Sequence, residues 1–133
     1  MNQAIVLDTN ILVSAWLTPN SALSTIVEVA VLRKVPVHVC PAIMAEYQDV
    51  LSRSRFERLG PWEPWLDRLL QVAFRNPDPA PWPHLGPDPD DLVFLALAKT
   101  TGSMLVTGNL ADFPKAIREG VPVLTPAEYL QRQ

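Results

Sequence analysis

The sequence predicts an α/β fold, a three-layer α/β/α sandwich whose central parallel sheet has four to five strands. Short, fully apolar runs such as residues 4–7 and 104–106 are typical of strands that are buried on both faces. Longer segments between these runs carry apolar residues at helical spacing. The two kinds of segment alternate along the chain, which favours parallel strands joined by helical crossovers.

The first half of the chain is expected to hold two strands and three helices. Asp8, Thr9 and Asn10 directly follow the first strand, and each is a good N-cap residue for the helix behind it. Pro41 suits the first turn of a later helix. The expected elements are a strand ending at residue 7, a helix over residues 11–17, a helix running to about residue 34, a strand within residues 35–40 and a helix over residues 41–53.

The second half begins with helical pattern and then becomes rich in proline. Residues 76–89 hold many prolines and are expected to form an extended loop. Asp88 is a suitable N-cap for the next helix, with Pro89 in its first turn. The expected elements are a helix over residues 56–74 interrupted near 60–61, a helix ending at Gly102, a strand over 104–106, a helix over 111–118, a strand over 121–124 and a last helix capped by Thr125, with Glu128 completing a capping box.

Composition predicts one globular domain over residues 1–133. The chain is 48% hydrophobic and 19% charged, which excludes intrinsic disorder. The single cysteine, Cys40, allows no internal disulfide. No uncharged apolar stretch reaches about 20 residues, and the N-terminus lacks signal-peptide features, so we expect a cytoplasmic protein without a membrane partner. The net charge of −3 argues against a protein that simply coats nucleic acid.

Three carboxylates occupy positions where an α/β fold gathers its active site. Asp8 follows the first strand, Glu46 borders the apolar stripe of a helix, and Asp91 opens another apolar helix. Charges directed towards a core are costly unless they are paired, protonated or bound to a metal. Because Mg²⁺ and Mn²⁺ prefer oxygen ligands, these acids predict a metal site suited to phosphodiester hydrolysis.

Each acid also has a purely structural interpretation. Asp8 can cap the helix that follows it, and Asp91 can be the third residue of a helix capped by Asp88. Glu46 can extend from the edge of its stripe to an arginine. Only the combination of the three, spread over an alternating α/β chain, favours a site.

Four motifs of the chain resemble those of a PIN domain, the nuclease domain of VapC-type toxins in bacterial toxin–antitoxin pairs and of related ribonucleases. The resemblance covers the whole chain, and its motifs stand in the expected order. They are residues 6–10 (VLDTN), 41–47 (PAIMAEY), 88–91 (DPDD) leading into 94–98 (FLALA), and 105–109 (LVTGN).

The resemblance implies a metal-dependent endoribonuclease, the toxin of a type II toxin–antitoxin pair. Its catalytic and metal-binding acids would be Asp8, Glu46 and Asp91, holding Mg²⁺ or Mn²⁺. Asn10 and Thr107 would support them. The family commonly has an aspartate where this chain has Asn109. Asn109 would support the site as a weak ligand or as a hydrogen-bond partner of a metal-bound water, and Asp112 would compensate for the missing charge. The implied partners are an RNA substrate, a cognate antitoxin protein and a second copy of the chain in a homodimer.

A second hypothesis comes from the asparagine at position 109, where the family commonly has an aspartate. With Asn109 in place of an acid, the chain can be a PIN-like module that binds RNA or protein without cutting.

Among the tryptophans, Trp62 and Trp65 are assigned to the core or a partner interface, because they share a helix with Leu66 and Leu69. Trp82, in the proline-rich loop, is the better candidate for a contact surface that stacks on bases.

Overall fold

The sheet is parallel throughout. The computed structural model describes residues 3–18, 21–32, 35–53 and 60–132. Its strands are β1 (Ile5–Leu7), β2 (His38–Val39), β3 (Phe74–Arg75), β4 (Met104–Val106) and β5 (Val123–Leu124). Strands β1, β4 and β5 form one parallel group and β2 pairs with β3 in another. A parallel bridge between Ile5 and Val37 joins the two groups, so the strand order is β3-β2-β1-β4-β5. This confirms the predicted α/β fold.

The strand order reverses direction between β1 and β4. From β1 the chain first moves outward through β2 to β3 and then returns to place β4 on the other side of β1. Leu7 pairs with Val106 at the last position of the two strands. In parallel sheets ligands bind beyond the carboxyl ends of the strands at such a reversal. Asp8 and Thr107, the residues that follow these strands, therefore emerge side by side at the expected place for a site.

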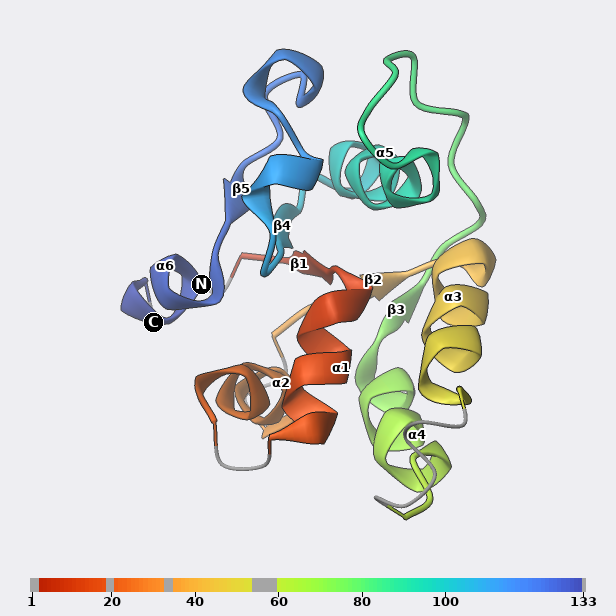
Figure 1. Cartoon of the computed structure of the whole chain (residues 1–133), viewed down its shortest axis with the longest axis vertical. Helices are drawn as coiled ribbons and strands as arrows, with labels where there is room; N and C mark the ends of the chain where they lie inside the picture. The colour runs from red at the N-terminus through yellow and green to blue at the C-terminus, as the bar shows by residue number, and fades with distance from the viewer. Residues whose placement is uncertain (1–2, 19–20, 33–34, 54–59, 133) are drawn as a thin grey trace.

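Helices cover both sides of the sheet (Figure 1). In this view α5 lies on one side of β1, whereas α1 and α2 lie on the other. The α-helices are α1 (Thr9–Leu17), α2 (Ala22–Leu32), α3 (Pro41–Leu51), α4 (Glu63–Val72), α5 (Leu92–Thr101) and α6 (Pro126–Gln131), and the 3₁₀ turns are η2 (Pro89–Asp91), η3 (Leu110–Asp112) and η4 (Lys115–Ile117). No helix within the described ranges has the length and apolar character needed to cross a bilayer.

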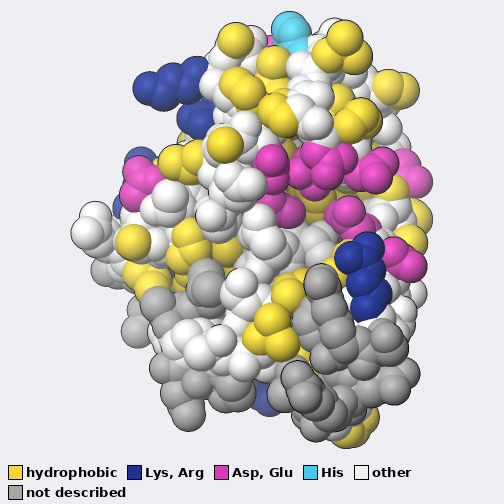
Figure 2. Space-filling model, viewed as in Figure 1, with side chains coloured by type: hydrophobic (Ala, Val, Ile, Leu, Met, Phe, Trp, Pro, Cys, Tyr) yellow, Lys and Arg dark blue, Asp and Glu magenta, His cyan; other side chains and the backbone are white. Residues whose placement is uncertain are grey.

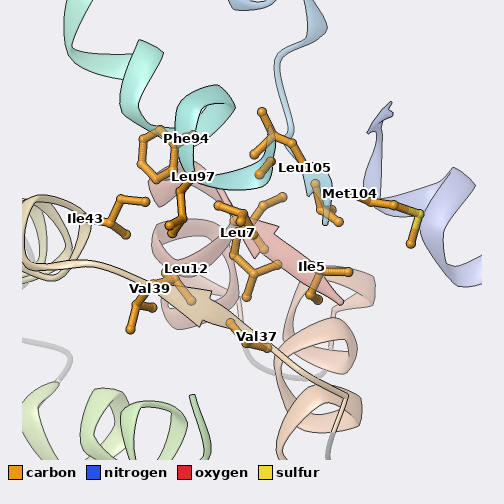
Figure 3. Close-up of a cluster of buried hydrophobic side chains, with 14 of the residues drawn as sticks. Ile5, Leu7, Leu12, Val37, Val39, Ile43, Phe94, Leu97, Met104 and Leu105 are labelled. Atoms are coloured by element: carbon orange, nitrogen blue, oxygen red, sulfur yellow. The ribbon is translucent and has the colours of Figure 1, made fainter. Parts of the chain in front are cut away.

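The core lies around β1, which is buried on both faces. Phe94 and Leu97 reach the strand from α5, and Leu12 comes from α1 on the opposite side (Figure 3). All three side chains are fully buried, as is Leu7 at the end of the strand. Burial of this apolar surface fixes the level at which β1 ends, and therefore the place where Asp8 leaves the sheet.

Several predicted boundary signals are confirmed. Pro41 stands in the first turn of α3, and Gly102 ends α5 with φ of 68°, a left-handed conformation that glycine adopts without strain. Asp88 caps η2 by accepting a hydrogen bond from the backbone N–H of Asp90. Thr125 and Glu128 form the complete capping box of α6.

The predicted helix over residues 56–74 was wrong at its C-terminal end. Helix α4 ends at Val72, and Phe74 belongs to strand β3. The backbone N–H of Phe74 donates to Val37 over 2.7 Å and that of Asn76 donates to Val39 over 2.9 Å, so pairing with β2 decides the local conformation. Residues 56–59 of this prediction lie outside the described ranges, as do residues 33–34 at the predicted end of the second helix.

The predicted helix over residues 111–118 was also wrong. The segment forms two separate 3₁₀ turns, η3 and η4, with Pro114 between them. Proline has no backbone N–H, and its ring disfavours the α conformation of the residue before it. A continuous helix through this position is therefore unfavourable, and η3 is instead closed by the side chain of Asn109, which accepts from Ala111.

Candidate active site

Asp8 is a buried carboxylate that capping does not explain. It stands at the N-cap position of α1, yet its side chain makes no capping hydrogen bond. Instead Asp8 Oδ2 accepts from the hydroxyl of Thr107 over 2.8 Å and from the side-chain amide of Asn10 over 3.1 Å. Only 3% of Asp8 is exposed. The carboxylate is thus held by residues from both sides of the reversal point.

Asn10 and Thr107 also bind the loop that follows β4. The backbone N–H of Gly108 donates to Asn10 Oδ1 over 3.0 Å, and that of Asn109 donates to Thr107 Oγ1 over 3.0 Å. Asn10 therefore contacts Asp8 with its amide nitrogen and the loop with its amide oxygen. Thr107 contacts both with its single hydroxyl oxygen. This arrangement fixes the position of the carboxylate relative to the end of β4.

Glu46 projects from the middle of α3 towards the start of α1. Its Oε2 accepts a hydrogen bond of 2.8 Å from the hydroxyl of Thr9, the residue after Asp8. The neighbouring residue on α3, Tyr47, is fully buried and donates its hydroxyl hydrogen bond to the backbone carbonyl of Leu7. Two consecutive residues of α3 are therefore attached to the end of β1 and the first turn of α1.

Asp91 is the last residue of η2, the turn that leads into α5. Asp88 caps this turn, so the position of Asp91 agrees with that of an acid in a capped first turn. Its own carboxylate, however, makes no capping hydrogen bond to α5. As with Asp8, the backbone position is one that capping favours, but the side chain makes no capping hydrogen bond and borders a pocket instead.

Asp8 and Asp91 line the same pocket. It has a volume of about 290 Å³ and is bordered by four carboxylates, those of Asp8, Asp88, Asp91 and Asp112. A second pocket of about 510 Å³ lies between α3 and η2, and Glu46 lines it together with Asp49 and Asp90. In Figure 2 acidic side chains gather from the middle of the view to its right edge. We call the acids that border the two pockets the acidic belt: Asp8, Glu46, Asp49, Asp88, Asp90, Asp91 and Asp112. The structure thus brings Asp8, Asp91 and Asp112 together and places Glu46 in the adjoining pocket.

Among the described residues, the one Lys or Arg ion pair on this belt joins Asp49 to Arg53 over 3.7 Å. Burial, followed by the charges of Asp8, Asp88 and Asp112, raises the pKa of Asp91 to about 7. Burial also raises the pKa of Asp8, against the hydrogen bond from Thr107, and that of Glu46, against the hydrogen bond from Thr9. Among the described residues no Lys or Arg forms an ion pair with any of these three acids.

The donor set fits a hard divalent cation. Mg²⁺ is commonly bound through one or two carboxylates, with waters and substrate phosphates completing its coordination. The carboxylates of Asp8 and Asp91 in one pocket meet that requirement. A cation between them would relieve the repulsion that adds to the effect of burial on the pKa of Asp91. Three His, Cys, Asp or Glu side chains converging on one point are not found within the part of the chain that the structure describes. Glu46 lines the adjoining pocket and not the one that Asp8 and Asp91 share.

Asn109 is engaged by its neighbours. Its amide nitrogen donates to Asp112 Oδ2 over 3.1 Å, and its Oδ1 accepts from the backbone N–H of Ala111 over 3.2 Å. Asp112 lines the pocket of Asp8, whereas Asn109 is not among the residues that border it. The predicted role of Asn109 as a weak ligand thus has less structural support than the predicted contribution of Asp112.

Sequence reasoning missed two contributors. Thr9 was considered only as an N-cap, although its hydroxyl joins Glu46 to the segment that carries Asp8. Asp88 was expected only to cap the next helix, and it does cap η2, but it also borders the pocket. For Asp88 the signal was its place in the run of acids at residues 88–91. For Thr9 no local signal distinguishes a cap from a long-range donor.

Comparison with known proteins agrees with the fold. Residues 4–111 match the model of the PIN domain family. No curated protein sequence matches the chain. VapBC2 from Rickettsia felis, solved bound to a promoter DNA fragment, has a similar structure, with a TM-score of 0.65, 19% identity and coverage of 92% of this chain and 98% of that chain. FitAcB from Neisseria gonorrhoeae is similar with a TM-score of 0.63, 18% identity and the same coverage, 92% and 98%.

Proposed function

This chain belongs to the PIN domain family, and from that premise we propose that it is a metal-dependent endoribonuclease that hydrolyses RNA phosphodiester bonds. The observation that carries the proposal is the pocket shared by Asp8 and Asp91, where burial raises the pKa of both acids, the charge of Asp8 adds to the rise at Asp91, and no Lys or Arg of the described residues pairs with either. Such perturbed acids in a cleft are characteristic of functional sites.

The proposed cofactor is Mg²⁺ or Mn²⁺, held by Asp8 and Asp91. When bound, such an ion orients the phosphodiester and stabilises the charge that develops on its oxygens. The protein prepares Asp8 for this role through Thr107 and Asn10, whose hydrogen bonds keep Oδ2 in place. Asp112, on the same pocket, adds negative charge that favours a cation.

Glu46 is proposed to receive a proton from the attacking water. Thr9 engages its Oε2, and we assign the proton to Oε1. Burial raises the pKa of Glu46 above its ordinary range, which makes the carboxylate a better proton acceptor near neutral pH. The position of Glu46 in the adjoining pocket, one hydrogen bond from the residue after Asp8, suits a base that acts beside the cation.

We further propose that the chain is the toxin of a type II toxin–antitoxin pair. Support comes from the order of its motifs, which resembles VapC-type toxins, and from structural similarity to VapBC2 and FitAcB. The partner would be an antitoxin protein that covers the acidic belt, and the toxin itself would form a homodimer. Copurification with the product of a neighbouring small gene tests the first partner, and light scattering of the isolated chain tests the second.

Two observations favour a second candidate, a PIN-like module that binds RNA or protein without cutting. Both polar atoms of Asn109 are used in local hydrogen bonds, and Glu46 stands apart from the pocket of Asp8 and Asp91. If Asp112 does not compensate for the missing acid, cation binding would be weak and cleavage lost.

The test is cleavage of a labelled mixed RNA pool by the purified, antitoxin-free protein. Reactions with Mn²⁺, with Mg²⁺ and with chelator are compared for the wild type and Asp8→Ala. Asp67→Ala is the matched control, because Asp67 is an exposed acid on α4 that lines neither acidic pocket. Metal-dependent cutting that Asp8→Ala loses and Asp67→Ala retains supports the nuclease. Folded protein that binds RNA but cuts under no condition supports the module.

A further inference from the structure

An apolar pocket lies under the proline-rich segment that leads from β3 to η2. It has a volume of about 260 Å³. Pro81 and Trp82 form its wall on the side of the segment, and Val93 and Ala96 form its wall on α5. No charged residue borders it. This composition differs from that of the two acidic pockets and suits a neutral, flat ligand.

Trp82 is held in one orientation. Its indole Nε1 donates to the backbone carbonyl of Ile117 over 2.8 Å. Its ring contacts that of His84 with centroids 6.1 Å apart, and His84 in turn lies 3.0 Å from a carboxylate oxygen of Glu119. A ring that is fixed before a ligand arrives loses little side-chain entropy on binding.

The segment itself is closely packed where it returns to η2. A Cβ atom added at Gly86 would stand 2.9 Å from the end of the Leu92 side chain and 3.1 Å from the end of the Ile117 side chain, so any larger residue here would have to displace them. Gly86 therefore brings the backbone against α5 and η4 a few residues after Trp82. The pocket wall is anchored at both places, by the Trp82 hydrogen bond and by the Gly86 contact.

The apolar pocket adjoins the acidic belt, because it shares two lining residues with the pocket of Glu46. Pro89 and Val93 border both this pocket and the acidic pocket that contains Glu46. In Figure 2 hydrophobic side chains gather directly beside the acidic belt, over the region of α5 and the segment before it. A ligand with an anionic part at the belt and a neutral part beside it would span both.

From this adjacency we propose that the pocket lined by Trp82 binds one nucleobase of a single-stranded RNA whose phosphate backbone runs along the acidic belt. The proposal rests on the proposed nuclease function for its ligand. Uncharged walls exclude phosphate and charged side chains, whereas an indole ring and prolines offer surfaces on which any base can stack. Because no charged group borders the pocket, its preference among the four bases should be small.

The direct test follows the indole N–H resonance of Trp82 by NMR. The probe is a single-stranded 2′-O-methyl RNA hexamer, which resists cleavage, added with Mg²⁺. The expected result is a saturable shift of this resonance. A hexamer with abasic positions should bind about tenfold more weakly, the size of effect that one stacked base produces. A Trp82 resonance that does not respond to the hexamer overturns the proposal, whether or not the protein cuts RNA.

Variants separate the pocket from the rest of the segment. Ala80 borders the pocket from an exposed position, so Ala80→Phe fills the space without altering the core. Trp82→Ala removes the platform. Both should weaken hexamer binding about tenfold. Leu85→Ala is the matched control, because Leu85 is 93% exposed on the same segment and does not border the pocket. Unchanged affinity in a folded Ala80→Phe protein contradicts the proposal.

Failure of this proposal is distinguishable from failure of the nuclease. Cleavage by the wild type without a response at Trp82 leaves the nuclease in place and removes the base subsite. A response at Trp82 with no cleavage of ordinary RNA leaves the subsite in place and favours the binding module.

Discussion

Thr9 donates a hydrogen bond of 2.8 Å from its hydroxyl to Oε2 of Glu46, joining the first turn of α1 to the middle of α3. The residue before Thr9 is Asp8, so one short segment carries a buried acid and the donor that orients another. Only 7% of Thr9 is exposed, and the hydrogen bond is therefore partly shielded from competing water. The relative position of Asp8 and Glu46 depends on this contact.

Replacing Thr9 should slow cleavage more than it weakens substrate binding. Thr9→Val keeps the shape of the side chain and removes the donor, so Glu46 loses its orientation while the fold is kept. A hydrogen bond to a charged group contributes about 1.5–3 kcal/mol, which predicts a fall in kcat of roughly tenfold to a hundredfold. Steady-state kinetics on one labelled RNA measure this effect, with KM expected to change little.

The matched control is Thr9→Ser, which restores the hydroxyl. It should recover most of the lost kcat, and the limb of the pH–rate profile that reports Glu46 should return towards its wild-type position. If Thr9→Val and Thr9→Ser lose the same amount of kcat, cleavage does not depend on the hydrogen bond to Glu46, and the loss comes from altered packing.

Asp91 should make the metal-free protein less stable as the pH rises. Burial and neighbouring acids raise its pKa from 3.8 to about 7 in the folded state. Between about pH 4 and about pH 7 the folded state therefore holds a proton at Asp91 that the unfolded state has released, so stability falls across this window. Asp91→Asn removes this dependence. Urea unfolding in chelator at several pH values should show that the variant gains on the wild type as the pH rises.

The same pair of proteins tests the cation. Mg²⁺ should raise the Tm of the wild type at neutral pH and have a smaller effect on Asp91→Asn, since binding to the folded state adds stability. Asp67→Asn, at an exposed site on α4, should follow the wild type in both experiments. If the unfolding free energy of Asp91→Asn depends on pH in the same way as that of the wild type across the whole window, Asp91 does not have a raised pKa in the folded state.

Most of the fold could be read from local patterns, because each pattern has a local cause. Gly102 ends α5 since only a left-handed conformation closes the helix there, and Thr125 with Glu128 completes a capping box. The strand at Phe74 could not be read in this way. Its sequence continues a helical stripe, and the conformation is decided by hydrogen bonds to Val37 in a distant part of the chain.

The candidate site likewise has some features that the sequence predicts and others that only the packing of distant segments decides. The place of Asp8 after a buried strand follows from the sequence, as does its nearness to Thr107, because parallel strands end at one edge. That Glu46 faces an adjoining pocket depends on the angle between α3 and α1, which packing sets. The link through Thr9 depends on the same angle, and no spacing in the sequence encodes it.

Asn109→Asp should change the response to a cation. Asn109 now donates to Asp112 over 3.1 Å, and an aspartate there would place two carboxylates against each other. In chelator the variant should have a lower Tm than the wild type, and Mg²⁺ or Mn²⁺ should restore it and bind more tightly. Thermal unfolding over a metal titration measures both effects. A variant that is destabilised equally with and without metal would show that position 109 does not reach the cation.

Tyr47→Phe should lower the stability of the whole domain. The hydroxyl is fully buried and donates to the carbonyl of Leu7, one residue before Asp8. Without it that carbonyl is left buried and unpaired, which costs about 1–3 kcal/mol of unfolding free energy in urea denaturation. Ser52→Ala is the control, because Ser52 donates to the carbonyl of Asp49 from an exposed position and its loss should cost far less. Since the end of β1 is anchored by this hydroxyl, Tyr47→Phe should also reduce cleavage, and a variant of unchanged stability would show that the Leu7 carbonyl finds another donor.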